Sequence, residues 1–133
     1  MTETVVVLGA GYAGAGAIMS LEDALGDEAD LTWISATDHH LVLHEAHRCI
    51  RNPSVRDKIT IPVEEIKSPS TRFIEGRVTD LDCDSRTIEL DERESVEYDY
   101  AVVCLGSQTA FYGIDGLEEN SLTIKSLGDA LAI

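Results

Sequence analysis

Apolar runs and helically spaced apolar positions alternate along the start of this chain, and together they predict an α/β fold. Residues 5–8 and 100–105 are continuous apolar runs, typical of strands buried on both faces of a parallel sheet. Residues 31–35 form a third apolar-rich strand. Between the first run and this strand, the spacing predicts a helix over residues 12–25, with Gly26 as its C-cap. Strand, helix and strand make a right-handed βαβ unit.

The predicted first helix has one apolar face. Ile18, Leu21 and Leu25 recur at helical spacing and share the face that packs on the sheet. Glu22 and Asp23 are expected to point away from that face.

Shorter segments separated by turn residues fill the middle of the chain. Residues 59–62 are expected to be extended, residues 63–67 to form a helical turn, and four short strands to follow at 71–75, 77–82, 87–90 and 95–98. The first of these strands joins the parallel sheet, and the others form an antiparallel meander. Ser126 and Asp129 resemble a capping box that opens a last helix. The predicted fold class is α/β, a Rossmann-like parallel sheet with helices on both faces plus a small antiparallel β-meander, in one domain spanning residues 1–133.

A glycine motif, GAGYAG at residues 9–14, lies where the first strand passes into the first helix. Gly9 permits a tight turn, Gly11 lets a pyrophosphate approach the backbone, and Gly14 lets the helix pack closely on the strand. The free N–H groups and the dipole at the helix start favour an anion there. A second strand-to-glycine turn ends at Gly106 and is expected beside the first, at the carboxyl edge of the sheet.

The second strand ends in Ser35, where dinucleotide folds place an acidic residue that binds the ribose hydroxyls. Asp38 is the nearest carboxylate. A serine hydroxyl can bind a sugar, but without the charge-assisted bond that a carboxylate provides.

All four histidines lie within residues 37–50. If this segment is helical, His40, His44 and His47 share a face near Glu45 and Cys49, which would suit a transition metal. No recognised ligand spacing is completed, so a polar helix lining a ligand cleft, or a solvated face, is the favoured interpretation. Cys49 is interpreted as a buried inert thiol, with a redox thiol as the alternative.

Composition narrows the possible partners and the environment. With 25 acidic and 10 basic residues, a net charge of -15 and a pI near 4.4, the chain would repel nucleic acid. An acidic, lysine-poor chain that is 44% hydrophobic predicts a folded protein of a salt-rich cytoplasm. No apolar run is long enough to span a bilayer, and three dispersed cysteines indicate a reducing cytoplasm without disulfides.

Five motifs together resemble the N-terminal part of a type II NADH dehydrogenase, within the FAD-dependent pyridine nucleotide–disulfide oxidoreductases. They are VVVLGAGYAGAGAI, DHHL, YDYAVVCLGS, FYGIDGLEEN and KSLGDA. The resemblance implies a bound FAD whose pyrophosphate is held by Gly9, Gly11, Ala13 and Gly14. It further places Ser35 and Ala36 at the adenosine ribose, Val78 at the adenine, and Cys104, Leu105, Gly106 and Ser107 near the phosphates of the flavin. No catalytic residue and no metal ligand is assigned.

By this resemblance the chain is an N-terminal fragment, because the second GxGxxG for NAD(P)H, the late Gly-Asp motif and the membrane-docking segment are absent from it. The whole protein would pass a hydride from NAD(P)H, bound by a domain not present in this chain, to FAD and then electrons to a quinone-like acceptor. Its implied location is cytoplasmic, membrane-peripheral only through the missing C-terminal part, with homo-oligomers an open question. The redox CxxxxC of disulfide reductases is absent. Alternatives are a stand-alone nucleotide-binding module or subunit without catalysis of its own, an NAD site in place of FAD, and an oxidase that uses Cys49.

Overall fold

The computed structural model describes residues 2–133, which form two compact units. The first unit comprises the chain up to residue 40 together with residues 62–106, and the second comprises residues 41–61 and 107–133. The chain therefore passes from one unit to the other three times. That the whole chain acts as a single domain stays a prediction.

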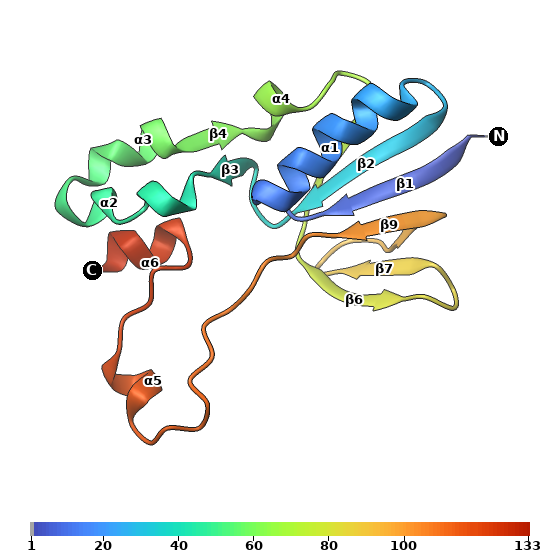
Figure 1. Cartoon of the computed structure of the whole chain (residues 1–133). Coiled ribbons are helices and arrows are strands. Elements are labelled where there is room, and N and C mark those ends of the chain that lie inside the picture. Colours follow the sequence, from blue (N-terminus) through green and yellow to red (C-terminus); the bar gives the residue numbers. More distant parts are fainter. Residues whose placement is uncertain (1) are drawn as a thin grey trace. The chain divides into compact units, whose positions relative to one another are not determined.

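A four-stranded parallel sheet forms the centre of the first unit (Figure 1). Its strands run in the order β5 (Arg72–Glu75), β2 (Ala29–Ser35), β1 (Glu3–Leu8) and β9 (Tyr100–Val103). β1 pairs in parallel with both β2 and β9, and β2 pairs in parallel with β5. The predicted strands are confirmed, including the 71–75 segment as the strand that joins this sheet.

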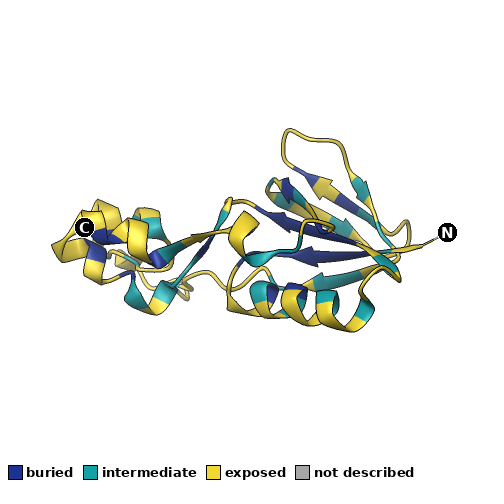
Figure 2. Cartoon of the chain, turned by 90° about the horizontal axis from the view of Figure 1, so that it is seen from above, coloured by how far each residue is buried: buried dark blue, intermediate teal, exposed yellow. Residues whose placement is uncertain are grey.

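Side chains alternate between the two faces of the sheet, and each face is covered by a different layer. Val7, Trp33 and partly buried Phe73 pack with α1 (Tyr12–Leu25) on one face. Val6 and Ile34 lie on the other, with the antiparallel meander of β6 (Val78–Asp82), β7 (Thr87–Leu90) and β8 (Val96–Glu97). The predicted α/β class is confirmed, with the difference that in this unit the meander, which carries its own buried Ile88 and Leu90, covers the face opposite α1. Figure 2 shows the buried residues concentrated on the strands.

Helix α1 begins and ends where its sequence pattern predicts. Ile18 is fully buried, and the Gly26 N–H donates to the Glu22 carbonyl at 3.1 Å, which caps the last turn. Glu22 on α1 is bound to a segment that lies far along the chain. Its carboxylate accepts hydrogen bonds from the Ser68 N–H at 2.8 Å and from the hydroxyl of Thr71, which is buried. A buried hydroxyl requires a partner, and this long-range pair is not visible in local spacing.

The Asp82 side chain holds the turn between β6 and β7. The Asp82 carboxylate accepts from the N–H groups of Asp84 at 2.8 Å and Ser85 at 2.9 Å. These bonds favour the ionised form and lower the pKa of the Asp82 carboxyl.

The second unit is built from short helices around its own core. The first segment contributes η1 (Leu43–Glu45), α2 (Arg48–Arg51), η2 (Pro53–Val55) and α3 (Arg56–Ile59), and the second contributes α5 (Leu117–Asn120) and α6 (Leu127–Ala132). The core consists of five buried residues: Ala46, Cys49, Val55, Ile59 and Ala130. The Ser126 hydroxyl accepts from the Asp129 N–H at 3.0 Å, so the predicted cap of the last helix is confirmed.

Residues 37–50 do not form one continuous helix, so the condition for His40, His44 and His47 to share a helical face is not met. Residues His39–Leu41 form the short strand β3, which pairs with β4 (Thr60–Pro62) in a two-stranded sheet. After it come a 3-10 turn and a single helical turn. The expected extended segment at 59–62 and the helical turn at 63–67 are present, as β4 and α4 (Val63–Ile66). Within residues 2–133, no helix combines the length and the apolar character needed to cross a bilayer.

Candidate functional site

The three motif glycines divide into two that are needed by packing and one that leaves the backbone open. Gly9 has φ +103°, and a Cβ there would lie 2.1 Å from the Cys104 carbonyl oxygen. A Cβ on Gly14 would lie 1.8 Å from the Gly9 carbonyl oxygen. A Cβ on Gly11 would meet no atom within 4 Å. Sterically, the fold requires glycine at the first two positions, whereas Gly11 exposes main chain to which a ligand has access.

Hydrogen bonds from two aromatic side chains hold the carbonyl groups of the glycine turn. The Trp33 indole N–H donates to the Gly9 carbonyl at 2.7 Å, and the Gly9 N–H donates to the Ile34 carbonyl at 2.7 Å. His40 Nδ1 lies 2.8 Å from the Ala10 carbonyl oxygen, and since a carbonyl only accepts, Nδ1 carries the hydrogen. These bonds fix the conformation of the turn that leads into α1.

Sequence reasoning did not find these supports. Trp33 is fully buried and His40 is buried with its ring edge-to-face against Tyr12, centroids 4.8 Å apart. The only local signal is a tryptophan two residues before the end of the second strand. Its partner lies 24 residues away in the chain.

We expect His40→Ala to destabilise the protein by about 1–3 kcal/mol, because it leaves the Ala10 carbonyl without its partner. The matched control is His44→Ala, whose side chain is 67% exposed, and which should change the free energy of unfolding by less than about 0.5 kcal/mol. Urea unfolding of both variants measures the difference. Equal effects would mean that the His40 bond does not stabilise the turn.

The second strand-to-glycine turn lies beside the first, as predicted. The Cys104 N–H donates to the Leu8 carbonyl at 2.8 Å, which continues the pairing of β9 with β1 to the edge of the sheet. Cys104 is half-buried against the core, Leu105 is 55% exposed, and Gly106 has φ +76°. Of the predicted pyrophosphate residues, Ala13 lies exposed in the first turn of α1.

The residues predicted at the adenosine end of the cofactor differ in their exposure and in their hydrogen bonds. Ser35 is only 7% exposed, and its hydroxyl accepts from the Thr37 N–H at 3.2 Å. Ala36 is exposed beside it. The half-buried Val78 side chain packs on the core between sheet and meander. Their contacts with a cofactor stay a prediction.

The histidines do not form a metal site. Among the described residues, no group of three or more His, Cys, Asp or Glu is arranged to hold a metal ion. His40 is engaged with Ala10, and His47 Nδ1 lies 3.0 Å from the His44 carbonyl oxygen. Cys49 is 1% exposed in the core of the second unit, in keeping with an inert thiol.

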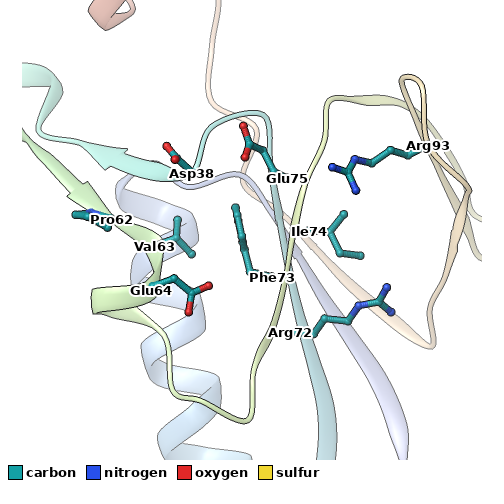
Figure 3. A pocket seen from close by; sticks show the side chains of 9 residues that line it. All are labelled: Asp38, Pro62, Val63, Glu64, Arg72, Phe73, Ile74, Glu75 and Arg93. Atoms are coloured by element: carbon teal, nitrogen blue, oxygen red, sulfur yellow. The ribbon is translucent and has the colours of Figure 1, made fainter.

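A cavity of about 470 Å³ opens beside the carboxyl ends of β2 and β5, within the first unit (Figure 3). Phe73, Val63 and Pro62 give it apolar walls, and Asp38 and Glu75 add two carboxylates. The sequence prediction named Asp38 but not Glu75. Strand register, which brings Glu75 opposite Ser35, is the information that sequence alone lacked.

Known proteins resemble this chain in sequence and in backbone structure. The type II NADH:quinone oxidoreductase of Staphylococcus haemolyticus is 31% identical over 128 residues, and that of Staphylococcus aureus is 29% identical over 125 residues. These alignments cover 95% and 92% of the chain but 32% and 31% of the relatives. The chain thus spans about a third of their length.

Two solved structures have closely similar backbones. The sulfide:quinone oxidoreductase of Aquifex aeolicus matches with a TM-score of 0.85 and 25% identity, over 98% of this chain and 30% of that one. NDH2 from Plasmodium falciparum, solved with NADH, matches with a TM-score of 0.86 and 17% identity, over 99% and 28%. The model of the pyridine nucleotide-disulphide oxidoreductase family matches residues 3–133, nearly the whole chain, and the chain therefore belongs to that family.

Proposed function

We propose that this chain holds the FAD of an NAD(P)H-dependent oxidoreductase that delivers electrons to a quinone-like acceptor. The observation that carries the proposal is the turn at Gly9–Gly14. Two of its glycines are demanded by backbone contacts of 2.1 and 1.8 Å, while Gly11 stands open at the start of α1. Open main-chain N–H groups at a helix N-terminus are suited to a pyrophosphate. The curated relatives named above, which are NADH:quinone oxidoreductases, support the choice of reaction.

The residues present fit this cofactor. In the proposal, N–H groups from residues 11–14 bind the pyrophosphate, and Trp33 and His40 hold the carbonyls of the same turn from behind. Cys104, Leu105 and Gly106 form the adjacent turn, which follows β9 and lies against Gly9. When bound, FAD would supply the redox chemistry, taking a hydride from NAD(P)H and releasing electrons to the acceptor. This chain contributes position and electrostatics, and no proton-transfer residue.

The acidity of the chain does not oppose this binding. The proposed phosphate contacts are main-chain N–H groups and a helix end, which are independent of the side-chain charge. Ion screening in a salt-rich cytoplasm would further weaken the repulsion that a net charge of -15 exerts on a dinucleotide.

The test uses the complete gene product. We expect it to purify yellow, with one FAD per chain, and to bleach on anaerobic addition of NADH or NADPH. A matched Gly11→Val variant, whose new side chain meets no protein atom near its Cβ, should fold and lose most of its FAD. Protein that is colourless and does not take up added FAD would refute the proposal. Protein that binds FAD but is not reduced would favour a binding module without catalysis of its own.

A further inference from the structure

We propose that Glu75, on β5, binds the adenosine ribose diol of the dinucleotide in this protein and replaces the carboxylate missing from the end of β2. The inference rests on the proposed FAD site and adds the residue that recognises its sugar. A ribose diol offers two hydroxyl donors, and a carboxylate is the side chain that accepts both most strongly.

Ser35 is poorly placed for this role. It occupies the strand end where an acidic residue is expected, but it is 7% exposed and its hydroxyl already accepts the Thr37 N–H at 3.2 Å. The same oxygen lies 3.5 Å from the Thr37 hydroxyl. A diol would have to displace these local bonds.

Glu75 stands next to Ser35 across the sheet. The register of β2 and β5 pairs Ser35 with Glu75, and Trp33 with Phe73. Side chains paired in register on neighbouring parallel strands point to the same face. Trp33 and Phe73 both pack on the α1 side, so Glu75 also lies on the side of the sheet from which the glycine turn enters its helix.

The carboxylate of Glu75 is available to bind a ligand. It is exposed, and among residues 2–133 it has no hydrogen-bond or ion-pair partner. Figure 3 shows it at the end of the cavity where β5 ends, above the ring of Phe73. This combination of an apolar wall and a free carboxylate suits a nucleoside. Its base would pack on the Phe73 ring, and its sugar would bind the Glu75 carboxylate.

Asp38 lines the same cavity and is the competing residue. Its carboxylate is already 2.9 Å from Nδ1 of His39, and its main-chain carbonyl accepts the Val63 N–H at 2.9 Å. The side chain is thus committed to a neighbour, whereas that of Glu75 is not. This difference decides the assignment in favour of Glu75.

The experiment measures dissociation constants of the complete apoprotein for FAD and for an FAD analogue carrying 2′,3′-dideoxyadenosine, by flavin fluorescence. Wild-type protein should bind the analogue about 10- to 100-fold more weakly than FAD, the range of a lost charge-assisted bond. Glu75→Gln and Glu75→Ala should weaken FAD binding by a similar factor and leave analogue binding nearly unchanged. Glu28→Gln, the same charge change in the turn between α1 and β2, should alter neither, and thermal unfolding checks that all variants fold.

Each other outcome has a distinct meaning. If wild-type protein binds FAD but the Glu75 variants bind it equally well, the assignment is overturned while the proposed function stands. If Asp38→Asn alone removes the preference for FAD over the analogue, the diol belongs to Asp38 and the proposal is wrong. If wild-type protein binds neither molecule, the proposed function fails, and this inference with it.

Discussion

Replacing Gly14 by alanine is expected to destabilise the protein by about 3 kcal/mol, the upper end of the cost of overpacking a core. The added Cβ would lie 1.8 Å from the Gly9 carbonyl oxygen, which is backbone and is itself held by Trp33. Because the contact is with backbone that the Trp33 bond holds, rotation of a side chain cannot relieve it. Urea unfolding followed by circular dichroism measures the loss.

Gly16→Ala provides the matched control in the same helix. Its Cβ would meet nothing within 4 Å, and Gly16 is exposed on α1. Alanine in a helix interior should stabilise by about 0.5–1 kcal/mol relative to glycine. Opposite signs for two identical substitutions two residues apart would verify the close contact of turn and helix. Two stabilising effects would show that α1 does not approach Gly9 as closely as described.

Trp33→Ala is expected to cost about 3–5 kcal/mol, the range for removing a large aromatic side chain from a core. Trp33 is fully buried, packs edge-to-face on Phe73 with centroids 6.3 Å apart, and binds the Gly9 carbonyl. The same unfolding experiment applies. Because the lost indole also frees the glycine turn, FAD affinity of the complete protein should fall in parallel.

Trp33→Phe separates packing from hydrogen bonding. It keeps an aromatic ring but removes the N–H donor, so we expect a cost of about 1–3 kcal/mol. If Trp33→Phe is as stable as wild-type protein, the bond to Gly9 contributes nothing, and the support assigned to this residue is mistaken.

The strands and the first helix were predictable because their signals are local. Continuous apolar residues at 5–8 and 100–105 can be buried on both faces only in a covered parallel sheet. The structure explains the glycines at 9 and 14 sterically, because a Cβ at either position would collide with a backbone carbonyl oxygen. Even the neighbouring position of the turn at Gly106 followed from topology, since carboxyl ends of parallel strands meet at one edge.

Long-range contacts are what spacing could not predict. The spacing within α1 places Glu22 away from the apolar face but does not show that it binds Ser68 and Thr71, 46 and 49 residues away. His40 fits a helical pattern of histidines, but its segment pairs as a strand and its ring reaches Ala10. Glu75 becomes a candidate only through its register with Ser35, which no pattern within β5 encodes.

The two neighbours of the central strand β1 come from very different places in the chain. Val5 pairs with Leu31 on one side and with Tyr100 on the other. On the ribosome, where N-terminal segments emerge first, the β1–α1–β2 crossover unit is complete early, while the other edge of β1 stays unpaired until β9 has been made. The second turn of the candidate site therefore forms late in synthesis. Until then, the edge of β1 that later pairs with β9 is accessible to molecules that bind nascent chains.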